Sequence, residues 1–249
     1  MDMKGKVFIV AGGGRDIGRS CAMALARRGA NILLTYHSSS DAALNVVQEI
    51  ETCGVKAIAL KADLTQESEA NAVVTAALES FGQINGLVHV SGGLLERIKI
   101  EDMSLQHWHN VMNVNLTSLF MMVHATIPHL KAGDSIVTFS SQAGRDGGGG
   151  GAVAYATSKG AIMTFTRGLA KELGAKNIRV NSVCPGMIST GFHDQFTQDD
   201  IRSKVAAATA LKREGTADEV GSLVAFLVSQ EASFMTGNCV DINGGLLFS

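Results

Sequence analysis

Short runs of β-forming apolar residues alternate along this chain with longer segments that have helical periodicity. The strand-like runs are KVFIVA (6–11), NILLTY (31–36), KAIAL (56–60), INGLVHV (84–90), SIVTFS (135–140), IRVNSV (178–183) and CVDI (239–242). Helical segments are expected at 17–28, 41–53, 67–81, 108–130 and 155–173, with further helix in the stretch up to 228. Strands that are apolar on both faces and alternate with helices indicate a parallel sheet covered on both sides. The alternation therefore predicts an α/β fold with a doubly wound parallel sheet.

The composition is that of one globular domain over 1–249. At 249 residues, 46% hydrophobic and 18% charged, the chain can bury a sizeable core, and only Pro128 and Pro185 interrupt it. The formal net charge is −2 with scattered basic residues, which indicates neither a nucleic-acid nor a membrane-surface partner. No window reaches the roughly 18 apolar residues of a membrane span, and the N-terminal stretch has no signal cleavage site. We expect a cytoplasmic protein with a small-molecule partner.

The four cysteines, Cys21, Cys53, Cys184 and Cys239, are widely separated. They form no C-x-x-C pair and have no histidine at metal-ligand spacing, so neither a zinc site nor a disulfide framework is expected. They are interpreted as small apolar residues in a reducing compartment.

A glycine-rich turn, GGGRDIG (12–18), directly follows the first strand. Such a turn lets the backbone approach a phosphate and points the N–H groups of the next helix toward it. The stretch nearly fits the phosphate loop G-x-x-x-x-G-K-[ST] of nucleotide hydrolases, with Arg19 in the lysine position. No later strand ends in an aspartate suited to magnesium, which argues against that class. The turn also departs from G-x-G-x-x-G, because Ile17 takes the place of the last glycine.

Asp16 occupies a position in this turn where another glycine would be expected. Its carboxylate directly precedes the helix predicted near Ile17, where it can accept the unpaired N–H groups of the first turn. Aspartate also tolerates a left-handed backbone better than most residues, and Arg15 can offset its charge. We favour an N-cap for Asp16, since a carboxylate near a bound pyrophosphate carries an electrostatic cost.

Tyr155 and Lys159 lie at i and i+4 of a predicted helix and therefore on one face. An ammonium close to the phenol would lower its pKa and make Tyr155 a usable general acid or base. Ser140 and Ser141 end the preceding strand, where a hydroxyl can hydrogen-bond a substrate carbonyl.

Several segments, in sequence order, resemble the motifs of the short-chain dehydrogenase/reductase family over essentially the whole chain. They are AGGGRDIG (11–18), ADLT (62–65), HVSGG (89–93), NVNLTS (113–118), Ser141 followed by Tyr155-x-x-x-Lys159, VNSVCPGMIST (180–190) and FMTGNCVDINGG (234–245). Ala11 and Asp16 depart from the T-G-x-x-x-G-x-G turn, and His89 and Val90 replace two asparagines of the family pattern. We expect His89 to be a packed residue at a strand end and not a base.

The resemblance implies a Rossmann-like domain that transfers a hydride between a nicotinamide cofactor and a carbonyl or secondary alcohol carbon, without a metal. Tyr155 would carry the hydroxyl proton, Ser141 orient the oxygen, Lys159 hold the ribose and lower the Tyr155 pKa, and Asn115 maintain a proton-relay water. Ser141 is chosen over Ser140 because the family places a glycine three residues after its serine. The residues implied at the cofactor are Gly12, Gly14, Arg15, Asp16, Ile17, Gly18, Tyr36, His37, Ser38, Asp63, Leu64, Ser91, Gly92, Tyr155, Lys159, Pro185, Gly186, Ile188 and Thr190.

The end of the second predicted strand indicates which cofactor is used. An NAD enzyme places a carboxylate there for the ribose 2′-hydroxyl, whereas a 2′-phosphate requires a cation. Tyr36, His37 and Ser38 occupy this corner, and the nearest acid downstream is Asp41. Arg15 resembles the basic residue that NADP-specific members use, although it can instead pair with Asp16. We favour NADP(H), with NAD(H) possible.

The substrate is indicated by the residues around the expected site. The segment 187–210 takes the place of the family's substrate lid and is polar, with His193 and Gln195, while Gln142 and Arg145 follow the catalytic serine. These favour a polar or anionic carbonyl or alcohol compound, such as a sugar or sugar acid. A 3-oxoacyl carrier-protein reductase is the alternative within the family, and a non-catalytic nucleotide-binding regulatory protein is the alternative outside it.

Two features remain beyond the chemistry. The glycine run 147–151 is interpreted either as a linker or as a loop that serves substrate access. The segment VMNVNLTSLFMMVHATI is apolar around much of its circumference, which together with the resemblance predicts a homotetramer.

Overall fold

The computed structural model describes residues 3–248, excluding the side chains of residues 193–195. Seven parallel strands form one sheet in the order β3-β2-β1-β4-β5-β6-β9. The strands are β1 (Val7–Ala11), β2 (Asn31–Tyr36), β3 (Ala57–Lys61), β4 (Gly86–His89), β5 (Ser135–Phe139), β6 (Arg179–Pro185) and β9 (Cys239–Ile242). The predicted doubly wound parallel sheet is confirmed.

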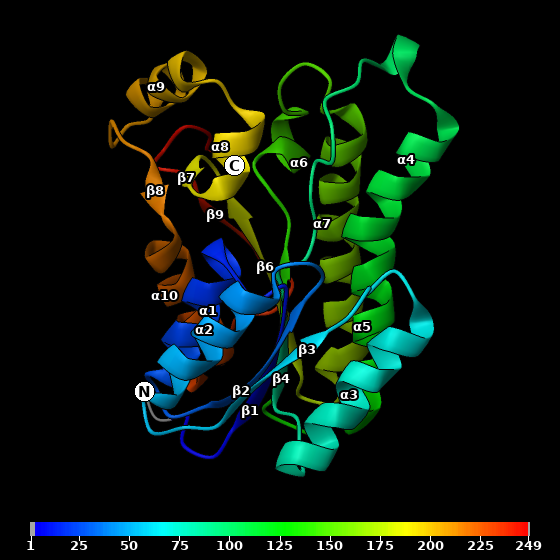
Figure 1. Cartoon of the computed structure of the whole chain (residues 1–249), viewed down its shortest axis with the longest axis vertical. Coiled ribbons are helices and arrows are strands. Elements are labelled where there is room, and N and C mark those ends of the chain that lie inside the picture. Colours follow the sequence, from blue (N-terminus) through cyan, green and yellow to red (C-terminus); the bar gives the residue numbers. More distant parts are fainter. Residues whose placement is uncertain (1–2, 249) are drawn as a thin grey trace.

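Helices cover both faces of this sheet (Figure 1). One face is covered by α1 (Asp16–Ala26), α2 (Ser40–Glu51) and α10 (Ala217–Val228), and the other by α3 (Glu67–Phe81), α5 (Ser118–Thr126) and α7 (Val153–Gly174), with α4 (Leu105–Met112) beside α7. Shorter helical turns are η1 (Ile100–Asp102), η3 (Ile127–His129), α6 (Ala143–Asp146) and η4 (Gln230–Ala232). None of the described helices is long and apolar enough to span a bilayer.

Strand β1, an inner strand of the sheet, separates two hydrophobic cores. Phe8 and Val10 pack into the core beneath α1, α2 and α10, whereas Ile9 and Ala11 pack into the core beneath α3, α5 and α7. These four side chains are at most 1% exposed. Because burial of one large aliphatic or aromatic side chain contributes about 1.5–3 kcal/mol, both faces of β1 stabilise its position inside the sheet.

The predicted helix over 108–130 is interrupted. Helix α4 ends at Met112, and a π-helical turn, η2 (Asn113–Thr117), connects it to α5. The inserted residue turns the side chain of Asn115 inward, where it is 0% exposed. π-Bulges of this kind occur frequently at functional sites, and hydrophobic periodicity alone does not reveal them.

The strand order reverses between β1 and β4, because β2 and β3 extend the sheet on one side and β5, β6 and β9 on the other. At this point the carboxyl ends of β1 and β4 are adjacent, with Ala11 opposite His89. Ligands of open α/β sheets bind in the crevice at such a switch point. The fold therefore places the glycine turn after β1 and the loop after β4 at the candidate site.

The segment 187–210, predicted as a lid, rises above this edge of the sheet (Figure 1). It comprises β7 (Ile188–Ser189), α8 (Gly191–Phe196) and α9 (Asp199–Ala208), and β7 pairs with β8 (Gly215–Thr216). Arg202 on α9 binds Glu214 through two hydrogen bonds of 2.7 Å, with both side chains less than 20% exposed. This bidentate pair fastens α9 to the returning chain.

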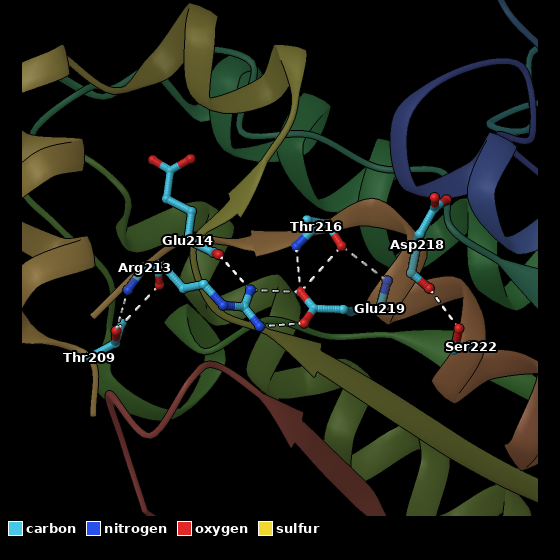
Figure 2. Close-up of polar contacts among 7 residues, drawn as sticks. All are labelled: Thr209, Arg213, Glu214, Thr216, Asp218, Glu219 and Ser222. Atoms are coloured by element: carbon cyan, nitrogen blue, oxygen red, sulfur yellow. Dashed lines mark hydrogen bonds and ion pairs between the residues drawn. The ribbon is translucent and has the colours of Figure 1, made fainter. Parts of the chain in front are cut away.

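The return from the lid to α10 is held by a polar cluster (Figure 2). Thr216 and Glu219 form a capping box at the start of α10, and the Arg213 guanidinium donates to Glu219 Oε2 at 3.0 Å. Arg213 and the backbone of Thr216 hold the pKa of the Glu219 carboxyl at about 2, well below its ordinary value. The far end of the lid is thus anchored to a helix of the main domain.

We expect Gly221→Ala to destabilise the fold by about 1–3 kcal/mol, because α1 and α10 cross where a Cβ has no room. An added Cβ would lie 2.5 Å from the backbone oxygen of Ser20. Gly174→Ala, where no atom lies within 4 Å, is the matched control and should be neutral or slightly stabilising. Urea denaturation compares the variants, and equal stability of Gly221→Ala and wild type would contradict the prediction.

Candidate active site

The glycine turn between β1 and α1 is compact. A Cβ on Gly18 would overlap the carbonyl oxygen of Gly12, and Gly12 itself has a φ of +81°. Thr35 of β2 fixes the turn by accepting from Gly12 N–H at its hydroxyl (3.0 Å) and from Gly13 N–H at its carbonyl (3.0 Å). The first-turn N–H groups of α1 have no partner within the helix and can face an anion. Thr35 was not identified from the sequence, where it reads as an ordinary strand residue.

The predicted N-cap role of Asp16 is wrong. The residue has a left-handed φ of +49°, which fits the expectation that it replaces a glycine, but the N-cap position falls on Arg15 and no side chain caps the helix. Instead, Asp16 Oδ1 accepts the N–H of Gly191 in the lid at 3.2 Å, and Oδ2 lies 3.8 Å from Arg15 Nε. With φ positive, the carboxylate points away from the first turn and toward the lid. The sequence contains no signal for this contact across 175 positions.

The corner at the end of β2 carries no carboxylate on its cavity surface other than Asp16. Tyr36, His37 and Ser38 line the cavity there together with Arg15, whereas Asp41 is not among the described lining residues. The side chain of Arg15 is 67% exposed, and its pairing with Asp16 is long. Arg19, the residue in the lysine position of a phosphate loop, pairs with Glu49 on α2 and does not line the cavity.

Two residues implied at the adenine do not line the cavity. Asp63 Oδ1 accepts from the backbone N–H (3.0 Å) and hydroxyl (2.7 Å) of Thr65, and Leu64 is 5% exposed. The hydrogen bonds from Thr65 and the proximity of His37 lower the pKa of the Asp63 carboxyl. The end of β3 therefore lies beside His37, but the Asp63 carboxylate is hydrogen-bonded to Thr65 in the turn that follows it.

Asn115 connects the π-helical turn to the loop after β4. Its side chain donates to the carbonyls of Gly93 (2.8 Å) and Val111 (2.9 Å) and accepts from Gly93 N–H (3.0 Å). A Cβ on Gly92 would come within 2.5 Å of Asn115 Oδ1 and 3.2 Å of Lys159 Nζ. The structure thus brings Asn115, Gly92 and Lys159 together, and Ser91 and Gly92 line the cavity.

The two serines after β5 differ in their contacts. Ser140 is buried and donates to the Lys159 carbonyl at 2.7 Å, whereas Ser141 hydrogen-bonds Tyr155. Gly144 approaches Gly160 of α7 so closely that a Cβ would lie 2.8 Å from Gly160 N. This contact explains the glycine three residues after Ser141, because it sets α6 directly against the helix that carries Tyr155.

Arg145, expected near the substrate, points elsewhere. It donates to Asp241 Oδ1 (2.7 Å) and to the Cys239 carbonyl (2.7 Å) on β9, and it does not line the cavity. Gln142 does line the cavity, and its buried Oε1 has no hydrogen-bond partner among the described residues. The side chains of His193 and Gln195 lie outside the described residues.

Tyr155 and Lys159 share one face of α7, with Lys159 Nζ 5.6 Å from the centre of the phenol ring. The ammonium is buried and donates to the Phe139 carbonyl at 2.8 Å. Burial lowers the Lys159 pKa to about 8 and raises the Tyr155 pKa, which the hydrogen bond from Ser141 partly counteracts. The expected lowering of the Tyr155 pKa by Lys159 is wrong for this structure, since desolvation of the phenol has the larger effect.

His89 is packed as predicted. It is 1% exposed and lies 3.4 Å from the Ser118 hydroxyl. Burial and the nearby Lys159 ammonium lower its pKa to about 3, so the imidazole is neutral at physiological pH. His89 therefore adds no positive charge next to the Lys159 ammonium.

Another side of the cavity is formed by the end of β6 and the segment that follows it. Pro185, Gly186, Ile188 and Thr190 all line the cavity. Gly186 donates to the Ile242 carbonyl at 3.0 Å, and a Cβ there would lie 2.7 Å from Asn243 Cβ. The end of β9 thereby fixes the course of this segment.

These walls enclose a cavity of about 660 Å³. The cavity is also lined by apolar side chains that were not predicted from the sequence, namely Leu94, Met187, Phe192, Ile201, Val205 and Leu246. Ile201 and Val205 lie at i and i+4 of α9 and therefore on one face, so this spacing could have indicated an apolar side of the lid helix. The Phe192 ring lies 6.1 Å from the Tyr155 ring and 5.0 Å from that of Phe196.

Known proteins share this architecture along the whole chain. A family model described as Enoyl-(Acyl carrier protein) reductase matches residues 11–247. The short-chain dehydrogenase/reductase FrzI of Cladobotryum sp. is 36% identical, with 97% of this chain and 96% of that protein covered. A dehydrogenase/reductase from Sinorhizobium meliloti 1021 has a TM-score of 0.94 at 31% identity, covering 98% of this chain and 96% of that one. A short chain dehydrogenase from Burkholderia cenocepacia J2315, solved in complex with NADP, has a TM-score of 0.92 at 32% identity, with 99% of each chain covered.

We expect Lys159→Met to raise the free energy of unfolding at pH 7 by about 1–3 kcal/mol while removing activity. In the wild type, the fall of the Lys159 pKa from 10.5 to about 8 destabilises the folded state by about 1.4 kcal/mol per pKa unit, and the variant is free of this cost. The variant also loses the hydrogen bond to the Phe139 carbonyl, which lowers its stability by about 1 kcal/mol.

The stability difference between wild type and Lys159→Met should depend on pH. Between pH 8 and 10.5 the unfolded chain retains the Lys159 proton and the folded chain does not, so wild-type stability rises with pH and the difference from Lys159→Met shrinks. Denaturant titrations at pH 7 and pH 10 measure this, with the exposed Lys171→Met as control. A destabilised Lys159→Met at pH 7 would show that the ammonium contributes net stability.

Proposed function

The chain belongs to the short-chain dehydrogenase/reductase family and is an NAD(P)-dependent oxidoreductase, and from this premise we propose that Tyr155 transfers the proton in carbonyl reduction with NADP(H). The supporting observation is the Ser141–Tyr155 hydrogen bond, with the buried Lys159 ammonium behind the phenol ring. Membership in an enzyme family sets aside the alternative of a non-catalytic nucleotide-binding protein.

The residues around the cavity fit a dinucleotide. The compact turn from Gly12 to Gly18 admits a close backbone approach, and the first turn of α1 offers unpaired N–H groups to a pyrophosphate. Lys159 would hold the nicotinamide ribose, and Ser91, Gly92, Ile188 and Thr190 would surround the nicotinamide.

The chemistry divides between cofactor and protein. When bound, the nicotinamide supplies a hydride to the carbonyl carbon, or accepts one from the alcohol carbon. Tyr155 Oη donates its proton to the carbonyl oxygen in reduction and takes it back in oxidation, while Ser141 hydrogen-bonds that oxygen. The raised pKa of Tyr155 keeps the phenol protonated, which suits proton donation. Asn115 holds the loop at Gly93 and, we propose, a water next to Lys159.

The cavity bears on the substrate. The apolar lining beyond Tyr155 favours a carbonyl compound with an apolar body over the sugar expected from the polar lid sequence. Two basic residues of the lid pair with acidic groups of the protein, Arg202 with Glu214 and Lys204 with Asp200. A 3-oxoacyl carrier-protein reductase remains the second candidate, because the same lining would accept an acyl chain.

The surface supports an oligomer. Large apolar side chains are exposed on α4, α5, α7 and near the C-terminus, including Leu105, Phe120, Val153, Phe234 and Phe248. These exposed side chains are compatible with the homotetramer that the family resemblance implies. We propose a cytoplasmic homotetramer.

Replacing Tyr155 by Phe tests the proposed reaction. The change removes one hydroxyl and leaves the ring and Lys159, so turnover should fall by at least about 10²- to 10⁴-fold while NADPH binding survives. Nicotinamide absorbance over a panel of ketones, 3-oxoacyl thioesters and sugars measures turnover, and fluorescence titration measures binding. Retention of most activity would assign the proton to another group.

Arg15→Ala tests the cofactor preference. Loss of a charge-assisted contact to the 2′-phosphate should weaken NADPH binding by about 1.5–3 kcal/mol and leave NADH binding nearly unchanged. Arg19→Ala removes the same kind of charge from the same segment but outside the cavity and should not change the NADPH-to-NADH ratio. Equal loss of both cofactors in Arg15→Ala would refute the assignment.

A further inference from the structure

Arg97 lies in the loop between β4 and η1 and lines the cavity on the side away from the cofactor turn. Its Nε donates to the Phe196 carbonyl of the lid at 3.1 Å, and its Nη1 donates to the Gly150 carbonyl at 3.1 Å. One side chain therefore joins three segments at the rim, namely the loop after β4, the glycine run and the end of α8.

The glycine run is shaped around this arginine. A Cβ on Gly151, whose φ is +74°, would lie 3.0 Å from Arg97 Cβ, and a Cβ on Gly149 would lie 3.4 Å from Nη1. Ile98 N–H also donates to the Gly151 carbonyl at 3.1 Å. Of the two interpretations of the run 147–151, these contacts favour a part of the site over a linker.

Among the described residues, no carboxylate pairs with Arg97. Its two partners are backbone carbonyls, and no described carboxylate lies within ion-pair distance. Asp146, the acid on the same rim, is engaged by Gln142 Nε2 (2.9 Å) and Gly148 N–H (2.8 Å). Three of the five guanidinium N–H groups remain, which is enough for a bidentate contact.

Arg97 and Tyr155 are connected through two phenylalanines of the lid. Arg97 bonds the backbone of Phe196, the Phe196 ring packs on Phe192, and the Phe192 ring packs on Tyr155. Because two aromatic rings lie between them, a ligand that contacts both Arg97 and Tyr155 must carry its anionic group several bonds away from the reacting carbon. The other lysine and arginine residues among the described lining residues are Arg15, in the glycine turn, and Lys159, next to Tyr155.

We propose that Arg97 binds a carboxylate of the substrate, so that this enzyme acts on carbonyl compounds with an apolar body and a carboxylate remote from the carbonyl. The inference rests on the proposed reduction at Tyr155 and adds its substrate class. The two carbonyl contacts orient the guanidinium, and its exposed position at the rim leaves it accessible to a carboxylate.

The experiment uses straight-chain oxo acids in which the carbonyl is moved stepwise away from the carboxylate, each compared with its methyl ester. For wild type with NADPH, kcat/KM should favour the acid over the ester by about tenfold or more at the longer separations and not at the shortest. Arg97→Gln should abolish this preference through a rise in the KM of the acid, with the ester changed less than about threefold.

Two variants serve as controls. Arg97→Lys keeps the charge without the planar fork and should retain part of the preference. Lys99→Gln removes a neighbouring charge that pairs with Glu101 and does not line the cavity, and it should leave the preference intact.

The outcomes separate the two proposals. An equal fall in kcat/KM for acid and ester in Arg97→Gln would show that Arg97 only connects the lid to the two loops. A wild-type preference for esters would also overturn the assignment. Turnover of neutral ketones without any oxo acid would overturn the substrate class but not the reaction. Failure to reduce any carbonyl compound with either nicotinamide would instead defeat the proposed function.

Discussion

The site is organised by the burial of one ammonium group at the carboxyl edge of the sheet. Lys159 is 4% exposed, and its charge is solvated by the Phe139 carbonyl instead of by a carboxylate. Neighbouring residues accommodate it, because His89 stays neutral and Gly92 leaves the space between Lys159 and Asn115 open. An unpaired buried cation costs stability, so its retention is a sign of chemistry and not of packing.

The cofactor turn and the lid are physically connected. Asp16 reaches the lid backbone at Gly191, next to Thr190, which lines the cavity. A glycine at position 16 would give the same left-handed backbone but no acceptor for that N–H. The backbone of the lid is therefore tied to the glycine turn, the segment that we propose binds the pyrophosphate, and this hydrogen bond is what the carboxylate contributes to the fold.

The sequence predicts what depends on local patterns and misses what depends on distant contacts. The strands and most helices follow from periodicity, and the pairing of Tyr155 with Lys159 follows from the spacing within one helix, whereas Ser141 was chosen through its resemblance to the motif of the family. The π-helical turn at Asn115 escaped because it inserts one residue without changing composition. The contacts of Asp16 and Arg145 were not predicted either, because their partners, Gly191 and Asp241, lie far away in the sequence.

The two ends of the cavity are built on different principles. The end with Tyr155 and Lys159 is fixed by close packing, as Gly144 against Gly160 shows, and tolerates little change. The other end is formed by loops that meet through backbone carbonyls, with Arg97 between them. Backbone contacts of this kind set the position of a loop without dictating its neighbouring side chains. Selectivity for the substrate can therefore change at the rim while the packing around Tyr155 and Lys159 stays constant, which is why the reaction class followed from the resemblance of the sequence to the family and the proposed substrate class did not.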